Sequence, residues 1–331
     1  VAVEADATVT FARARLGHYL APGARHAGRL VVTDIGLDGR WLDGADDGAV
    51  ANVPDLWRGA WPAPDPDGHK YGRGHALVTS GGALRTGAAR LASRAALRAG
   101  AGLVTLACPA DAAPTAAASV AAIMVEAFDG VAAFRASLAD RRRNALLLGP
   151  ALGTGPAEAA LVETALDAGD RALALDADAL APFAGRAEAL RERIAGRAAP
   201  VVVTPHEGEF ARLFTGRPEV TGAAPKHLRA RAAALATGAT VLLKGPDTCV
   251  AAPDGRVSIL RGAPASLATA GSGDTLAGLV VGLLAQGVPA FEAASAAAWL
   301  HAACARAFGP GLIAEDLAER LPAVLRALGR D

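Results

Sequence analysis

Short apolar runs alternate with amphipathic segments from residue 75 onward, and this alternation limits the folds that are open to the chain. Each apolar run ends in small or turn-forming residues, which is typical of β-strands. The predicted strands are HALVTSGG, GLVTLACP, AIMVEA, NALLLGP, RALALDA, PVVVTPH and TVLLKGP. Between them, TGAARLASRAALRAG, PAEAALVETALDAG and LRARAAALATG are predicted helices that end at glycine. Apolar strands that alternate with helices predict an α/β fold, with a mostly parallel central sheet and helices on both of its faces.

The composition is that of a soluble globular protein. Of the 331 residues, 52% are hydrophobic and 20% are charged, which is enough for one large domain or two smaller ones. The 33 basic and 33 acidic residues give a formal net charge of zero, so the charge pattern indicates neither a nucleic-acid surface nor a polybasic membrane patch. Any anionic ligand must therefore be held by local groups.

The cysteines and the apolar stretches indicate where in the cell the protein is expected. Cys108, Cys249 and Cys304 are widely separated and lack C-x-x-C spacing, so they indicate neither a disulfide framework nor a zinc site. The N-terminus lacks the pattern of a signal peptide, and the longest apolar stretch, near 276–285, is too short to cross a bilayer. We expect a cytoplasmic protein with no membrane partner.

The first part of the chain differs from the rest. Residues 53–69 carry four prolines and two tryptophans without helical or alternating periodicity, which predicts a linker. The preceding residues 1–52 offer only two short strand-like runs, too little to enclose a core of their own. The main domain is therefore predicted at 70–331.

Polar residues cluster in the loops that follow the predicted strands. In parallel α/β sheets, ligands bind beyond the carboxyl ends of the strands, where loops lead into helices. These loops read TSGGALRTGAA, GPALGTG, LDADAL, TPHEGEF, LKGPDT and ATAGSGD. Five of the six combine glycine or proline with an ionisable or hydroxyl-bearing residue, and LDADAL carries two aspartates, which together predict a ligand site at this edge of the sheet.

The GSGD loop precedes an apolar helical stretch. Gly271 and Gly273 allow backbone amides to turn toward an anion, and the free amides and positive dipole end of the next helix favour phosphate. Asp274 is poorly suited to hold phosphate, but it can act as the base for a hydroxyl that attacks phosphate. The structural alternative is that Asp274 only caps the helix.

Two other loops supply charged and polar groups. Lys244 and Thr248 follow a strand and are suited to a nucleotide or its phosphate, although an exposed loop lysine is often only solvated. In TPHEGEF, His206 is suited to contact a substrate and Glu209 a hydrated cation. Alternatively, both residues stabilise a helix N-terminus that Thr204 caps.

The remaining loops contain none of the common metal-binding or nucleotide-binding motifs. Asp176 and Asp178 can bind Mg²⁺ through water or cap the next helix, and no His or Cys spacing indicates a protein metal site, so Mg²⁺ is expected to arrive with a nucleotide. Ala88 and Gly153 belong to loops whose small residues allow a bulky ligand to approach the backbone. The G-x-G-x-x-G and Walker A motifs are absent.

Taken in order, these segments resemble the ADP-dependent NAD(P)H-hydrate dehydratases of the ribokinase-like superfamily. The resemblance runs from about residue 69 to 328 and rests on HKYGRGHALVTSGG, LLLGPALGTG, LDADAL, VVVTPHEGEFARLF, VLLKGPDT and ATAGSGDTLAGLVVGLLAQG. It implies a ribokinase-like three-layer sandwich. Residues 1–52 resemble the tail of the NAD(P)H-hydrate epimerase domain that is often fused upstream, whose glycine-rich front half is missing from this sequence. Epimerase activity is therefore not expected.

The resemblance also implies an activity and a set of site residues. The family restores hydrated NADH or NADPH, in the S form, with ADP and Mg²⁺, and releases AMP and phosphate. By resemblance, Asp274 is the base that deprotonates the hydroxyl of the hydrate. The other implied residues are Lys244, Gly245, Pro246, Asp247, Thr248, Gly271, Ser272 and Gly273 for the nucleotide, and Ala88, Gly153 and His206, with Asp274, for the hydrate. A homo-oligomer is also expected.

The sequence departs from the family pattern at a few positions. Ser272 and Thr275 replace the Thr and Val that are common around the GD pair, and Ala151 stands where glycine is frequent. Two other functions stay open at this point. One is a small-molecule kinase of the same superfamily, which uses ATP on a vitamin precursor or a sugar hydroxyl. The other is a nucleotide-binding subunit without catalytic activity.

Overall fold

The computed structural model describes residues 2–37, 48–63 and 65–330. Within these ranges, a ten-stranded sheet runs in the order β3-β12-β11-β10-β9-β8-β7-β4-β5-β6. Its strands are β3 (Ala49–Ala51), β4 (His75–Thr79), β5 (Leu103–Cys108), β6 (Met124–Ala127), β7 (Ala145–Leu148), β8 (Ala172–Leu175), β9 (Val201–Val203), β10 (Thr240–Leu243), β11 (Cys249–Ala251) and β12 (Val257–Ile259). All seven strands predicted from the sequence are present.

The sheet is mostly parallel. The pairs from β10 through β9, β8, β7, β4 and β5 to β6 are parallel, whereas β11 is antiparallel to both β10 and β12. The central strands β4, β7, β8, β9 and β10 are buried along their whole length, which explains their continuous apolar sequences. The predicted mostly parallel sheet is confirmed.

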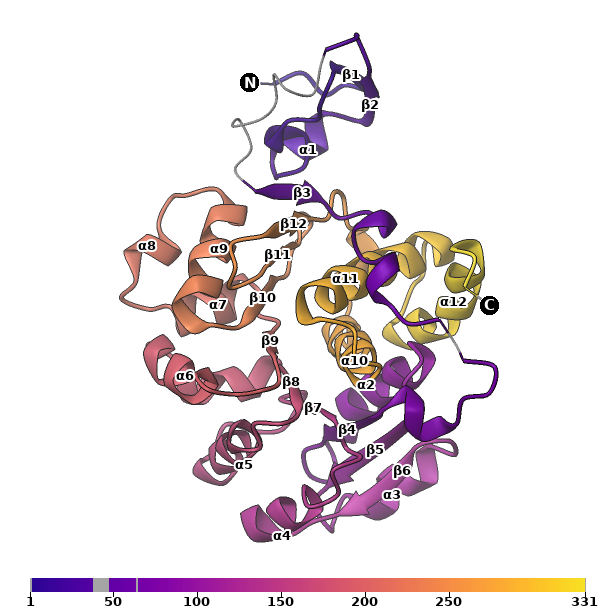
Figure 1. The fold of residues 1–331 in the computed structure, drawn as a ribbon, viewed down its shortest axis with the longest axis vertical. Coiled ribbons are helices and arrows are strands. Elements are labelled where there is room, and N and C mark those ends of the chain that lie inside the picture. Colours follow the sequence, from indigo (N-terminus) through magenta and orange to yellow (C-terminus); the bar gives the residue numbers. More distant parts are fainter. Residues whose placement is uncertain (1, 38–47, 64, 331) are drawn as a thin grey trace.

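Helices cover both faces of the sheet (Figure 1). Two separate apolar clusters, one on each face, form the core. The first face carries α2 (Thr86–Arg98), α3 (Ala113–Ser119), α10 (Ser272–Ala285), α11 (Ala290–Phe308) and α12 (Ala314–Ala327). The second carries α4 (Gly130–Ser137), α5 (Pro156–Asp167), α6 (Ala187–Ile194), α7 (Glu207–Leu213), α8 (Pro218–Thr221) and α9 (Lys226–Thr237). This is the predicted three-layer arrangement. None of the helices in the described ranges is long and apolar enough to cross a membrane.

Two glycines bring α10 against the backbone of α2. A methyl group on Gly278 would lie 2.2 Å from the carbonyl oxygen of Ala92, and one on Gly282 would lie 2.6 Å from that of Ala96. The obstacle is main chain, which cannot rotate away. Since α10 begins at the predicted phosphate loop, these contacts also fix where that loop lies.

We predict that Gly278→Ala lowers the free energy of unfolding by about 3 kcal/mol, because it forces the two helices apart. Thermal unfolding followed by circular dichroism measures the change. The matched control is Gly87→Ala in the first turn of α2, where an added methyl group meets no atom within 4 Å. That control should be neutral or more stable by about 0.5 kcal/mol, since alanine favours helix. Equal midpoints for the two variants would contradict the close approach.

The N-terminal residues form a small unit that lies beside the edge of the large sheet. In it, β1 (Ala7–Phe11) pairs in parallel with β2 (Arg29–Thr33), with α1 (Gly23–His26) between them. The guanidinium of Arg261 holds this unit by donating to the carbonyl oxygens of His18, Ala24 and Gly28. In Figure 1 the unit stands at one end of the molecule, next to β3.

The segments around the predicted domain boundaries pack against the main core. Strand β3 pairs in parallel with β12, so the large sheet begins before residue 52. In the predicted linker, Trp57 and Trp61 are buried, and the ring of Trp57 lies 5.8 Å from that of Trp299 in α11. Residues 38–47 and 64 of these two predicted segments lie outside the described residues.

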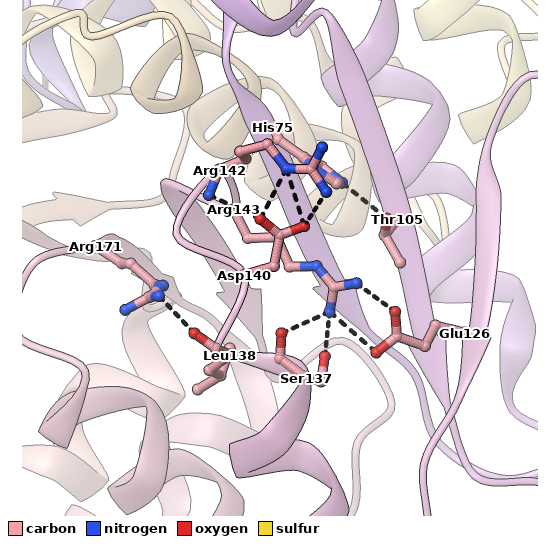
Figure 2. A network of polar contacts seen from close by, with 9 residues as sticks. All are labelled: His75, Thr105, Glu126, Ser137, Leu138, Asp140, Arg142, Arg143 and Arg171. Atoms are coloured by element: carbon pink, nitrogen blue, oxygen red, sulfur yellow. Dashed lines mark hydrogen bonds and ion pairs between the residues drawn. The ribbon is translucent and has the colours of Figure 1, made fainter.

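A polar network joins β4, β5 and β6 (Figure 2). His75 and Arg143 place it at the amino ends of β4 and β7, whereas the predicted ligand loops follow the carboxyl ends of the strands. The Nε2 atom of His75 lies 2.8 Å from Oγ1 of Thr105, and the guanidinium of Arg143 pairs with Glu126. Burial, together with the charge of Arg143, lowers the pKa of His75 to about 4.

This buried histidine predicts acid sensitivity. Below about pH 6.5 the unfolded chain binds a proton at His75 and the folded chain does not, so stability falls as the pH drops from about 6.5 to about 4. The loss from this group is up to about 3 kcal/mol. We expect His75→Gln to make the fall in unfolding midpoint between neutral and acid pH less steep than in the wild type. Parallel curves for the two proteins would exclude this role.

Candidate functional site

The predicted site residues gather where β8, β9 and β10 end. These strands are neighbours in the sheet, and Asp176, His206 and Lys244 follow them directly or within three residues. Helix α10 brings Asp274 to the same edge, as the pKa of Asp274 responds to the charges of Lys244 and Asp176. The carboxyl ends of neighbouring parallel strands therefore form the site.

Lys244 is the positive centre of this group. Its Nζ atom lies 2.8 Å from Oδ1 of Asp176 and 3.8 Å from Oε2 of Glu209. The Thr204 hydroxyl donates to the same Oδ1 of Asp176, so Thr204 does not cap α7 as the sequence suggests. Burial acts to lower the pKa of Lys244, but the carboxylates of Asp176 and Glu209 outweigh it and raise the pKa. The ammonium group is therefore fixed and stays charged.

Asp274 lies in the first turn of α10 and is half-buried. Burial raises its pKa to about 6, and the nearby charges of Asp176, Asp178 and Glu209 act in the same direction, whereas Lys244 opposes them. A carboxylate with this pKa is ionised near neutral pH and is a stronger base than an ordinary aspartate. It is suited to take a proton from a bound hydroxyl.

The glycine turn before Asp274 leaves backbone amides unpaired. Gly271 has φ +83°, and a methyl group there would lie 2.6 Å from Cδ1 of Leu91, so both its backbone and its space favour glycine. In the described chain, the amides of Gly273 and Asp274 donate to no other protein group, and that of Ser272 makes only a 3.4 Å contact with Thr269. Unpaired donors at a helix N-terminus are suited to bind an anion.

A cavity of about 380 Å³ opens beside this turn, a size typical of small-molecule sites. It joins the LKGPDT and GSGD loops, which lie about 30 residues apart in the sequence. The predicted site residues that line it are His206, Lys244, Gly245, Pro246, Thr248, Ser272 and Gly273. Its apolar wall comes from Leu260, Ala263, Pro264, Ala265, Leu267, Ala268, Leu276, Ala298 and Ala302. Apolar side chains for a base, together with the Lys244 ammonium group and free backbone amides for phosphate, suit a nucleotide.

A second, more open cavity of about 620 Å³ contains Gly153. Gly82, Arg85, Asp111 and Glu158 are among its other lining residues. The amide of Gly153 donates to Oδ2 of Asp178, 2.9 Å away, which links this cavity to the carboxylates around Asp274. Ala88, in the first turn of α2, lines neither cavity.

Two predicted nucleotide residues are occupied by contacts within the protein. Asp247 lies outside the lining of the first cavity, and its carboxylate accepts from Nζ of Lys226 at 3.0 Å and from the amide of Ala21 at 2.9 Å. The Thr248 hydroxyl donates to the carbonyl oxygen of Gly245, which closes the loop. Gly271 also lies outside that lining, below the helix start that it shapes.

His206 caps α7 with its own side chain. Its Nδ1 atom accepts from the amides of Gly208 and Glu209, so the ring hydrogen is on Nε2, which lies 3.4 Å from Oε1 of Glu209. Glu209 returns the contact by accepting from the amide of His206. The structural alternative from the sequence is therefore present, and the half-exposed ring also lines the first cavity.

Some features of the site were absent from the sequence prediction. His301, in the middle of the alanine-rich helix α11, lines the first cavity, and no local motif marks it. Lys226 supports the LKGPDT loop by donating to the carbonyl oxygen of Lys244. Its only signal in the sequence was the scarcity of lysine. In the described ranges, no group of three or more His, Cys, Asp or Glu residues is arranged to hold a metal ion.

Two alanines near the site have left-handed backbones. Ala151 has φ +50° and Ala177, between Asp176 and Asp178, has φ +45°. Ala151, where the family often has glycine, thus has a backbone conformation that favours glycine. Alanine there lowers the free energy of unfolding by about 1 kcal/mol relative to glycine. Such residues are common at binding sites, where the surrounding structure holds them.

Comparison with known proteins gives consistent matches. A sequence profile of the NAD(P)H-hydrate dehydratase family matches residues 76–322. A bifunctional NAD(P)H-hydrate repair enzyme from Salinibacter ruber is 38% identical over 98% of this chain and 62% of its own length. An ADP-dependent (S)-NAD(P)H-hydrate dehydratase from Xanthomonas campestris is 37% identical over 82% of this chain and 94% of its own. The chain thus spans less than two thirds of the bifunctional relatives it matches.

Solved structures share the fold. The ADP/ATP-dependent NAD(P)H-hydrate dehydratase from Bacillus subtilis, co-crystallised with ATP and Mg²⁺, superposes with a TM-score of 0.72 at 28% identity, over 84% of this chain and 98% of that one. A ribokinase-like superfamily protein from Enterococcus faecalis superposes with a TM-score of 0.71 at 22% identity, over 85% of this chain and 96% of that one. The predicted ribokinase-like fold is confirmed.

Proposed function

Because this chain belongs to the NAD(P)H-hydrate dehydratase family, we propose that it restores the S form of hydrated NADH and NADPH to NADH and NADPH, with ADP as co-substrate. The observation that carries this proposal is a basic carboxylate, Asp274, in a turn with unpaired backbone amides whose residues Ser272 and Gly273 line a cavity of about 380 Å³, although Asp274 itself lies outside that lining. The relatives named above support the choice of substrates.

The chemistry follows from the poor leaving ability of the hydroxyl group on the hydrated ring. Asp274 takes the proton of that hydroxyl while the hydroxyl oxygen attacks the terminal phosphorus of ADP. The bond between the two phosphoryl groups breaks, and AMP leaves. The carbon–oxygen bond of the phosphorylated hydrate then breaks. The lone pair of the ring nitrogen assists, inorganic phosphate departs, and loss of a ring proton restores the dihydronicotinamide.

The residues of this chain divide between the two substrates. We assign Lys244, Gly245, Pro246 and Thr248 to the nucleotide, together with the amides of Gly271, Ser272 and Gly273, because all but Gly271 line the first cavity. Asp247 is assigned there through its support of the loop. Each amide that bonds a transferring phosphoryl group is worth about 3 kcal/mol in comparable sites. When bound with the nucleotide, Mg²⁺ would neutralise phosphate charge.

The hydrated dinucleotide is assigned to the second cavity and its borders. Gly153 lines that cavity, and its bond to Asp178 connects the cavity with the surroundings of Asp274. His206 lines the first cavity. Ala88, in the first turn of α2, lines neither cavity, and its assignment to the hydrate follows the family resemblance. We propose that the hydrated ring lies between the two cavities, with its hydroxyl group directed toward Asp274 and the terminal phosphate.

The kinase alternative is less well supported. The same base and amides would serve ATP and a sugar or vitamin hydroxyl, but the family profile and the relatives at 37–38% identity are named as NAD(P)H-hydrate enzymes. A kinase would retain phosphate on its product, whereas the proposed enzyme releases phosphate.

We also propose that residues 1–52 correspond to the tail of the epimerase domain, 53–69 to a linker and 70–331 to the dehydratase, in a cytoplasmic homo-oligomer.

The function is tested with hydrated NADH, Mg²⁺ and either ADP or ATP. We expect recovery of the dihydronicotinamide absorbance with ADP, and equal amounts of NADH, AMP and phosphate. Transfer of phosphate from ATP to a sugar or vitamin-precursor hydroxyl to give a stable product, without recovery of the absorbance from hydrated NADH, would favour the kinase instead. Sedimentation in the same buffer measures the oligomer.

A further inference from the structure

A buried histidine from a separate helix contacts the first turn of α10. The Nε2 atom of His301 lies 2.9 Å from the carbonyl oxygen of Ser272 and 3.1 Å from its Oγ atom. His301 is only 7% exposed, and both residues line the first cavity. None of the roles assigned above uses this histidine.

The two contacts determine where the hydrogens lie. A carbonyl oxygen only accepts, so Nε2 of His301 must carry a hydrogen. The ring is neutral, because burial lowers the pKa of His301 to about 4 despite the opposing bond to the Ser272 carbonyl. The Ser272 hydroxyl therefore accepts from the ring. Its own hydrogen has no acceptor within the part of the chain that the structure describes.

We propose that His301 is a positioning residue for the phosphate site, which holds the first turn of α10 and leaves the Ser272 hydroxyl free to donate to a phosphate oxygen. The proposal rests on the proposed function in taking the first cavity as the nucleotide site. It adds a hydroxyl donor to the unpaired amides of Gly273 and Asp274, which belong to the same turn. Three donors from one turn suit an oxyanion.

The orientation matters because a serine hydroxyl rotates freely. Without the ring, this hydroxyl can turn toward the space that His301 vacates, and the helix start loses its anchor on α11. With the ring in place, one lone pair of Oγ is occupied and the hydrogen points elsewhere. The histidine thus acts on the nucleotide through Ser272.

The test measures ADP binding by calorimetry in Ser272→Ala, His301→Phe and the double variant. Loss of one such donor predicts that each single change raises the Kd for ADP about tenfold. The double variant should be no weaker than about tenfold, because both changes remove the same donor. His301→Gln retains a donor near the Nε2 position and should recover most of the affinity. Adenosine, which lacks phosphate, should bind all variants equally.

The matched control is Ser295→Ala, on the same helix. Its hydroxyl is bonded to Ser258 at 2.7 Å and lies outside the cavity lining, so ADP affinity should be unchanged. A Kd for the double variant near a hundredfold weaker would mean independent effects and would overturn the proposal. So would normal ADP affinity in folded His301→Phe.

If His301→Phe does not fold, Ser272→Ala decides. An unchanged Kd for ADP then contradicts the proposal, and a loss confined to ADP over adenosine supports it. A wild-type protein that binds ADP but does not restore NADH would refute the proposed function, and the binding result would remain.

Discussion

Replacing Asp274 by asparagine should lower kcat about 10²- to 10⁴-fold, the usual contribution of a general base. The amide has nearly the same shape but cannot accept the proton of the attacking hydroxyl. Because the substitution removes only a half-buried charge that lies near other carboxylates, the protein should fold and bind ADP at least as well as the wild type. Steady-state kinetics and ADP calorimetry measure the two effects.

The matched control for this variant is Asp316→Asn. Asp316 also lies in the first turn of a helix, α12, where its carboxylate accepts from the amide of Ile313, the residue before the helix. Its carboxylate is bonded within its own helix start and is not among the charges that act on Asp274, so kcat should be unchanged. Undiminished turnover in Asp274→Asn would remove Asp274 as the base.

The same residue sets an expected pH dependence. Asp274 acts only when it is deprotonated, and its pKa is raised to about 6. The value of kcat/KM should therefore fall as the pH drops through about 6 and level off above it, since this parameter reports the free enzyme. A limb near the ordinary aspartate value of about 4 would mean that burial and the neighbouring carboxylates do not act on the base.

Replacing Lys244 by methionine should have the second largest effect. It leaves Asp176 buried and without its cationic partner, which costs about 3 to 5 kcal/mol of folding stability. It also removes a positive charge that lowers the pKa of Asp274, so the acid limb of kcat/KM should move to higher pH. Thermal unfolding and the pH profile measure these changes, and the KM for ADP should rise as well.

The double variant Lys244→Met/Asp176→Asn serves as the control for that result. Asparagine at 176 removes the unpaired buried charge, so part of the lost stability should return. Asp176 raises the pKa of Asp274, and its neutralisation should move the acid limb back toward lower pH. Strictly additive losses of stability would show that Lys244 and Asp176 do not stabilise each other.

The repeated pattern of strand and helix was readable from the sequence because the central strands are buried on both faces. Strands such as β7 and β10 therefore carry uninterrupted apolar residues. The antiparallel strands β11 and β12 were missed, since they are short and follow β10 with no helix between them, outside the strand–helix alternation that marked the equally short β9. Burial of Trp57 was equally hidden, because a proline-rich sequence without periodicity also fits an exposed linker.

The site divides in the same way. Loops such as LKGPDT and GSGD could be recognised from the sequence because glycine stands next to a charged residue. The topology then brings Lys244 and Ser272 to one cavity. The sequence could not predict which side chains bond to each other. The Asp247 carboxylate accepts hydrogen bonds from Lys226 and from the amide of Ala21, which are remote in the chain. His301 is likewise visible only when α11 packs against α10. Contacts between distant segments carry no local pattern.

The fate of one oxygen atom tests the central claim most directly. The hydroxyl of hydrated NADH is labelled with the heavy isotope of oxygen, and the products of ADP-dependent turnover are analysed by mass spectrometry. If that hydroxyl attacks the terminal phosphorus with Asp274 as base, the label leaves in inorganic phosphate, one atom per molecule formed. Label recovered in water, with unlabelled phosphate, would mean that ADP is hydrolysed separately and would contradict the account.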